Sequence, residues 1–206
     1  MTARPRDEVD GARAASRTRI LDAARDLFAE RGFVACRVAD VARRAAMSPG
    51  NVYWHFESKE AILREILTHG FGSLETMTAE VAAEYGPARR KLDILVDRTI
   101  ALYEANAPFT VILGGLMGSG GQELVRSLGF DMAEIGGRYH ANLRRVFAEA
   151  RAEGAVAASA DPDLLVSFYF AFFNGLLITY SDLWPTLPRD ALRAAVLRLV
   201  GYRAAG

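Results

Sequence analysis

The sequence of 206 residues predicts an all-α fold of about nine helices. Apolar residues recur at intervals of three and four along most of the chain, which is the spacing of helices that bury one face. No stretch alternates polar and apolar residues for long enough to predict a strand. Hydrophobic residues make up 51% of the chain, so we expect a sizeable core and exclude a disordered chain.

Residues 1–15 predict a disordered arm of mixed charge, because they lack apolar periodicity. A first helix is expected from Ser16 to Arg31, where Gly32 ends it. The face of this helix that turns inward is formed by Ile20, Ala24, Leu27 and Phe28. The spacing of these four residues therefore marks the first element that can pack against a core.

Three helices are expected next. A short one covers residues 38–45. Another begins at Ser48, a preferred N-cap residue, and Pro49 is tolerated at its first helical position. Ser58 caps the next one, which continues to about residue 85. Beyond it, glycine and proline separate the remaining expected elements: a helix over 88–105, an apolar segment over 109–116, a glycine-rich joint over 118–121, a long helix over 122–153, and helices after Pro162 and Pro188.

Only Ala46 and Met47 join the second helix to the third, which is the spacing of a helix-turn-helix. In that motif the second helix lies in the major groove of DNA, and residues 48–55 would be this reading helix. Residues 1–56 hold 10 arginines against 7 acidic residues, a net charge of +3 whose sign suits nucleic acid. The alternative is ordinary helix packing, which any all-α protein contains.

Four runs of residues carry a resemblance to a known family. They are ILDAARDLFAERGF over 20–33, VADVA over 38–42, SPGNVYWHF over 48–56 and SKEAI over 58–62. Together they resemble the N-terminal domain of TetR-type transcriptional regulators, with every spacing preserved. The rest of the chain is expected to match that family in architecture alone.

The resemblance implies a set of DNA contacts. Tyr53, His55 and Lys59 would hold phosphates, while the start of the reading helix would face base edges. Asn51 could pair with an adenine edge through its amide. The full set expected to bind DNA is Arg37, Arg43, Arg44, Ser48, Pro49, Gly50, Asn51, Tyr53, Trp54, His55 and Lys59.

Two positions depart from the family pattern. Arg37 replaces the Ser or Thr that usually caps the second helix, a loss of about 1 kcal/mol, although its guanidinium could reach a phosphate. Ala46 stands where the turn usually has glycine, and a positive φ there would cost alanine about 1 kcal/mol. We therefore expect a slightly repacked turn within an intact motif.

Specific DNA binding predicts a homodimer on a palindromic operator, because one such domain offers few phosphate contacts. Residues 164–180 are apolar nearly all round and would pair with the last helix across the interface. The residues expected there are Leu164, Phe173, Leu177, Leu192, Val196 and Leu199. A membrane span is disfavoured, because 17 residues interrupted by polar side chains fall short of the 20 or so required.

The middle of the chain could hold a hydrophobic small molecule, neutral or anionic. The residues expected to line this cavity are Tyr103, Phe109, Leu113, Met117, Tyr139, Phe168 and Phe172, with Asn174 as a polar handle. The alternative is that these side chains simply fill the core. The sequence does not identify the ligand.

An enzyme is not expected, and neither is a cofactor or a metal. The glycine-rich joint lacks the lysine of a P-loop, the three histidines are scattered, and the single Cys36 offers no zinc spacing and suits the cytoplasm. No signal peptide is visible. We thus expect a disordered arm over 1–15, a helix-turn-helix domain over 16–60 and a helical ligand-binding and dimerisation domain over 61–206.

The function expected is a ligand-responsive transcriptional regulator, a repressor that a hydrophobic small molecule releases from a palindromic operator. The alternative is a helical carrier or enzyme that retains the motif only as a packing unit.

Overall fold

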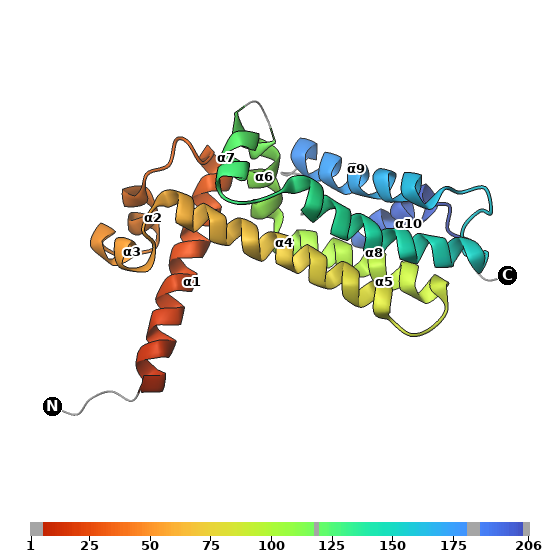
Figure 1. The fold of residues 1–206 in the computed structure, drawn as a ribbon, viewed down its shortest axis with the longest axis horizontal. Helices are drawn as coiled ribbons and strands as arrows, with labels where there is room; N and C mark the ends of the chain where they lie inside the picture. Colours follow the sequence, from red (N-terminus) through yellow and green to blue (C-terminus); the bar gives the residue numbers. More distant parts are fainter. Residues whose placement is uncertain (1–5, 118–119, 181–185, 204–206) are drawn as a thin grey trace. The chain divides into compact units, whose positions relative to one another are not determined.

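A computed structural model describes residues 6–117, 120–180 and 186–203, and over these residues the chain is all-helical, as predicted (Figure 1). Ten helices lie in the described part, close to the nine expected. The chain divides into two compact units, Met1–His69 and Gly70–Gly206. Parts of two expected features, the N-terminal arm at 1–5 and the glycine-rich joint at 118–119, lie outside the described residues.

The first unit contains α1 (Arg6–Arg31), α2 (Val38–Arg44), α3 (Pro49–His55) and the start of α4 (Lys59–Ala83). Its core joins the inward faces of all four helices. Its buried side chains include Ile20, Ala24, Leu27, Phe28, Val41, Val52, Phe56, Ile62, Leu63, Ile66 and Leu67. The apolar periodicity predicted this core, including the four residues expected on the inward face of the first helix.

Helix α1 begins at Arg6, so the prediction that the arm is disordered was wrong for residues 6–15. Residues 10–15 are exposed, which explains why they show no apolar periodicity. Alanine and arginine in this stretch are strong helix formers, so the helix extends by propensity without a face to bury. The first compact unit also ends within α4 at His69, beyond the boundary expected at residue 60.

The second unit contains the rest of α4 and six further helices. These are α5 (Ala88–Ala105), α6 (Ala107–Leu116), α7 (Gly121–Ser127), α8 (Met132–Ala152), α9 (Pro162–Tyr180) and α10 (Arg189–Leu199). Its core cluster includes Leu92, Leu95, Ile100, Phe147, Tyr169, Phe173 and Val196. The Tyr169 hydroxyl lies 2.7 Å from the Thr99 hydroxyl, a buried hydrogen bond between α9 and α5. Among the described residues, no helix combines the length and apolar character that a membrane span needs.

The long helix expected over 122–153 is two helices, because Gly129 ends α7. Gly129 has φ +87°, a left-handed conformation that glycine adopts without strain. The Phe130 N–H then donates to the Val125 carbonyl at 3.3 Å, which closes the helix end. Asp131 caps α8 by accepting the Ala133 N–H at 2.9 Å. The glycine-to-aspartate spacing in the sequence was the signal that the prediction missed.

Gly70 of α4 lies directly against Phe109 of α6. A Cβ at position 70 would lie 2.2 Å from the Phe109 ring, so no larger residue fits there without movement. Phe71 meets the same ring edge to face at 5.5 Å and also meets Phe130 at 5.4 Å. The Tyr139 hydroxyl donates to the Phe71 carbonyl at 3.1 Å. These aromatic residues therefore fix α4 against α6 and α8 within the second unit.

Replacing Gly70 by alanine should destabilise the fold by about 1–3 kcal/mol, because the new methyl group overpacks the Phe109 contact. Gly72→Ala is the matched control, since it lies on the same helix with nothing within 4 Å of an added Cβ. That variant should be neutral or more stable by up to about 1 kcal/mol, as alanine favours helix. Urea unfolding measures both changes, and equal effects would contradict the steric explanation.

Candidate nucleic-acid interface

The turn between α2 and α3 has a strained backbone at Ala46. Ala46 has φ +53°, in the left-handed region that costs alanine about 1 kcal/mol. The Met47 N–H donates to the Ala42 carbonyl at 2.9 Å and closes the end of α2. Ser48 then caps α3, because its Oγ accepts the Asn51 N–H at 3.2 Å. The sequence predicted the serine cap and the cost of a positive φ at Ala46, but the slight repacking expected of this turn does not avoid that conformation.

Helix α3 presents its polar and aromatic side chains to solvent. Val52 and Phe56 are buried and form its inward side. The exposed residues are Ser48, Pro49, Gly50, Asn51, Tyr53 and Trp54. Tyr53 and Trp54 are 55% and 64% exposed, which is high for large aromatic side chains. The helix is therefore available to a partner along one side.

The expected loss of the α2 cap at Arg37 is partly compensated by Asp40. The Arg37 backbone N–H donates to Asp40 Oδ2 at 3.0 Å. This hydrogen bond, followed by the nearby Arg43 charge, lowers the pKa of Asp40. Within the described residues, no carboxylate pairs with the Arg37 guanidinium, which is exposed. Arg37 can therefore reach a phosphate without losing an ion pair there.

Arg43 and Arg44 are exposed but paired with carboxylates. Arg43 pairs with Asp40, and Arg44 donates to both oxygens of Glu30 at 3.0 and 2.8 Å. Exposed pairs of this kind contribute little to stability. Both guanidiniums can therefore exchange a carboxylate for a phosphate at a small free-energy cost.

Lys59 has partners that the sequence did not predict. Its Nζ donates to the backbone carbonyls of Phe33 and Cys36, both at 2.8 Å, and lies 3.5 Å from the Val34 carbonyl. The ammonium group also lies 4.2 Å from the centre of the Phe33 ring. In this structure Lys59 therefore ties the start of α4 to the loop between α1 and α2. The phosphate contact that the resemblance implies remains a prediction.

His55 at the end of α3 is partly buried. Its Nδ1 is buried and has no hydrogen-bond partner among the described residues. Desolvation, followed by the charges of Arg17 and Arg13, lowers the pKa of His55. A neutral imidazole can offer a phosphate one N–H but no charge.

Sequence reasoning missed Arg17, which lies in α1 but contacts the end of α3. Its NH1 donates to the His55 carbonyl at 2.9 Å. It lies before the apolar face of α1, and nothing in the local pattern distinguishes it from the exposed Arg19 nearby. Only the packing of α1 against α3 and α4 gives Arg17 its partners.

The residues expected to line a ligand cavity lie in separate places. Tyr103, Phe109 and Tyr139 are buried, and the Tyr103 hydroxyl meets the expected polar handle Asn174 at 3.3 Å. The cavity beside Tyr103 and Phe109 has a volume of only about 10 Å³, room for about one water molecule at most. Leu113 and Phe172 are partly buried, whereas Phe168 is 49% exposed on α9.

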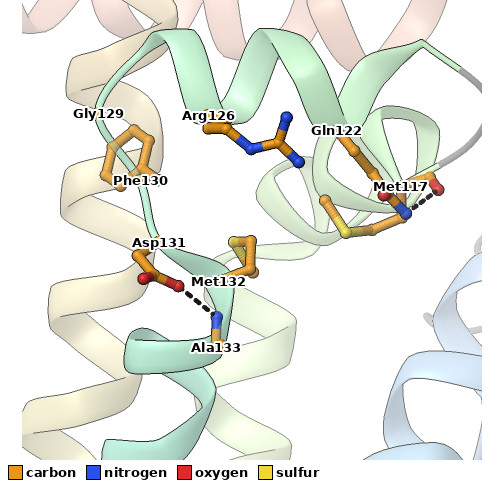
Figure 2. Close-up of a pocket in the computed structure, with 8 residues that line it drawn as sticks. All are labelled: Met117, Gln122, Arg126, Gly129, Phe130, Asp131, Met132 and Ala133. Atoms are coloured by element: carbon orange, nitrogen blue, oxygen red, sulfur yellow. Dashed lines mark hydrogen bonds between the residues drawn. The ribbon is translucent and has the colours of Figure 1, made fainter.

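A larger hollow of about 610 Å³ lies beside the expected residue Met117, between the end of α6, α7 and the start of α8. Figure 2 shows Gln122 and Arg126 of α7 across this hollow from Met132. Its lining combines apolar and polar side chains, from Met117, Gln122, Arg126, Gly129, Phe130, Asp131, Met132 and Ala133. Its volume is that of a small-molecule site.

The residues expected at a dimer interface divide by exposure. Leu164 and Leu199 are exposed, as an interface residue must be. Phe173, Leu192 and Val196 are buried in the core of their own unit, so the structure does not leave them free for a partner. The side chain of Leu177 lies outside the described residues. Because α9 is apolar nearly all round, periodicity could not tell which of its faces packs inward.

Comparisons with known proteins point to one class, the helix-turn-helix regulators. Residues 20–66 match the model of a family described as bacterial regulatory proteins, tetR family. The HTH-type transcriptional repressor KstR2 of Rhodococcus jostii (strain RHA1) is 37% identical over 106 residues, 52% of each chain. The repressor DhaR of Mycobacterium sp. (strain GP1) is 25% identical over 172 residues, 81% of this chain and 83% of DhaR. The chain thus spans about half the length of KstR2.

Two solved structures extend the similarity in fold over most of the chain. The TetR family transcriptional regulator PfmR from Thermus thermophilus has a TM-score of 0.71 and 25% identity, over 91% of this chain and 97% of PfmR. FadR from Bacillus subtilis, solved with stearoyl-CoA, has a TM-score of 0.68 and 23% identity, over 89% of this chain and 97% of FadR. The resemblance to TetR-type regulators is therefore confirmed, by sequence in the N-terminal unit and by fold over most of the chain.

Replacing Lys59 by methionine should lower the free energy of unfolding by about 1–3 kcal/mol, because two carbonyls lose a charged hydrogen-bond donor. Arg43→Met is the control, as it removes an exposed cation whose only described pair lies on its own helix. That change should leave stability nearly unaltered. Thermal unfolding measures both, and an unchanged melting temperature for Lys59→Met would show that Lys59 has no structural role.

Stability should fall as the pH drops below about 6.5, in part because of His55. The pKa of His55 is lowered in the folded chain, so the unfolded chain binds a proton first as the pH falls. Above the pKa that His55 has in the unfolded chain, His55 is neutral in both states and does not affect the free energy of unfolding. Below that pKa the unfolded chain gains a proton first, so the free energy of unfolding falls. The melting temperature of His55→Gln should fall less than that of the wild type between pH 7.5 and 5.5. Parallel falls would contradict this assignment.

Proposed function

We propose that the chain is a ligand-responsive transcriptional regulator that represses genes beside a palindromic operator. The observation that carries this proposal is α3, a capped helix of the matched tetR segment whose outward side is exposed. KstR2 and DhaR are both named as repressors, which supports repression rather than activation of the regulated genes. DNA as the partner implies that the protein acts in the cytoplasm.

The start of α3 reads bases in the proposed complex, and the residues around it hold the backbone. Gly50 and Asn51 lie in the first turn, where small side chains allow close approach to a groove. The Tyr53 hydroxyl and the exposed Arg37 are suited to phosphates, which fix the register of the domain on the duplex. The amide of Asn51 is suited to an adenine edge.

A second copy of the chain completes the proposed assembly. Helix α9 exposes an apolar stripe at Leu164, Phe168, Ala171 and Gly175. These residues recur at intervals of three and four, so they share one side of the helix. The small residues at the end of the stripe allow a second helix to approach closely, and an exposed apolar stripe of this kind favours a partner. A palindromic operator requires such a two-fold dimer.

The proposed ligand is a hydrophobic small molecule, neutral or anionic. The hollow beside Met117 offers apolar side chains from Phe130 and Met132 and the guanidinium of Arg126, which pairs with the exposed Glu123. The complex of B. subtilis FadR with stearoyl-CoA supports an apolar ligand class by analogy of fold. The ligand must bind the released state more tightly than the DNA-bound state, by about 5.5 kcal/mol for a shift from 1:99 to 99:1.

Selection of bound duplexes from a random DNA pool tests the proposal, and a palindromic winner is expected. With that duplex, Asn51→Ala should lower specific affinity about 10- to 100-fold, since one base contact is worth about 1–3 kcal/mol. Its affinity for a scrambled duplex should change little. Fluorescence anisotropy measures both affinities.

Asn142→Ala is the matched control, because it removes an amide from α8 in the second unit. Both of its DNA affinities should equal those of the wild type. A chain that enriches no sequence from the pool, while it still binds hydrophobic ligands, would instead be the helical carrier.

A further inference from the structure

Arg17 of α1 joins three elements of the first unit through one guanidinium. Its Nε donates to Glu65 Oε1 of α4 at 2.8 Å, and NH2 pairs with the other oxygen of the same carboxylate. NH1 donates to the backbone carbonyl of His55, the last residue of α3, at 2.9 Å. The guanidinium also lies 4.1 Å from the centre of the Phe56 ring.

The His55 carbonyl needs a hydrogen-bond donor from outside its own helix. The last four carbonyls of a helix have no partner within it, and α3 has only seven residues. A cation at this end also interacts favourably with the helix dipole. The guanidinium is held in place by Glu65, whose side chain is partly buried, and by contact with the buried Phe56 ring. Ser48 caps the N-terminal end of α3, and Arg17 supplies a hydrogen-bond donor at its C-terminal end.

We propose that Arg17 is a positioning residue for DNA reading, which fixes the orientation of α3 without contacting DNA. This inference rests on the proposed function. An arginine in a DNA-binding unit is usually assigned to a phosphate, but three N–H groups of Arg17 already point at protein oxygens. By holding His55 and Phe56, Arg17 sets the direction in which the side chains of Asn51 and Tyr53 point from α3.

Arginine is the residue type that this position requires. Its planar fork can pair with a carboxylate through two N–H groups, donate a third to a carbonyl and stack on a ring at the same time. A lysine can supply the charge and one or two of these hydrogen bonds in a less fixed geometry. Arg17→Lys should therefore lower the affinity for the selected duplex less than Arg17→Met does, without restoring the wild-type affinity.

The experiment measures affinity for the selected and the scrambled duplex over a series of salt concentrations. Arg17→Met should lower affinity for the selected duplex about tenfold and leave the scrambled duplex nearly unchanged. The slope of log affinity against log salt should equal that of the wild type, because no phosphate contact is lost. Arg19→Met, which removes an exposed cation from the same helix, is the control for net charge.

Amide hydrogen exchange of the protein alone gives a second readout. The Phe56 N–H donates to the Val52 carbonyl at 2.9 Å in the last turn of α3. Its exchange should accelerate in Arg17→Met, while that of the Ala45 N–H at the end of α2 should not. Equal acceleration at both amides would indicate general destabilisation and overturn the positioning role.

A phosphate contact by Arg17 predicts different results. The salt slope of Arg17→Met would then be smaller by about 0.9, and both duplexes would lose affinity alike. Glu65→Gln serves as a second variant if Arg17→Met fails to fold. It should lower the ratio of specific to non-specific affinity if Arg17 positions α3. If Arg17 binds phosphate, removing the competing carboxylate should instead strengthen both affinities.

The two proposals fail in different ways. A wild-type chain that prefers no duplex contradicts the proposed function and, with it, the role of Arg17 in reading. A wild-type chain that prefers one duplex, with an unchanged ratio of affinities in Arg17→Met, overturns the inference about Arg17 alone.

Discussion

The first unit depends on how α3 is held, because a helix of seven residues is too short to be stable alone. Its apolar contacts come from Val52 and Phe56, which are both buried. Its first turn is satisfied by Ser48, and the carbonyl of its last residue accepts a hydrogen bond from Arg17. Apart from the Ser48 cap, the exposed side chains of Asn51 and Tyr53 take no part in these contacts. They can therefore differ between proteins of one architecture without loss of the fold, which is what a reading surface requires.

In the second unit, close packing of side chains fixes the position of α4 against α6. The Phe109 ring lies where a side chain at position 70 would be, and the adjoining cavity of about 10 Å³ has room for about one water molecule at most. A ligand that entered between α4 and α6 would have to displace this ring from Gly70. Packed interiors shift between discrete arrangements rather than deform continuously. The contact of Phe109 with Gly70 and Phe71 therefore holds α4 and α6 in one packed arrangement within this unit.

The sequence predicted the elements that strong local signals define. Helix α5 was expected over 88–105 and is found there, and the Ser48 cap was expected because its signal lies within four residues. Partners across the fold were not predictable in this way. Lys59 has the loop carbonyls as acceptors because of how α1 and α4 pack, and no local pattern encodes that. The inward face of α9 was equally hidden, since an all-round apolar helix has no periodicity to show which side is buried.

Four cations of the first unit fall into two groups with different consequences for the proposed DNA contact. Arg17 and Lys59 donate to protein oxygens and support the fold, whereas the exposed Arg43 and Arg44 pair with the carboxylates of Asp40 and Glu30. Residues 1–56 carry only +3, so attraction to an arbitrary duplex is weak. In the proposed complex, the fit of a duplex to the surface of α3 would therefore have to add to the attraction between charges.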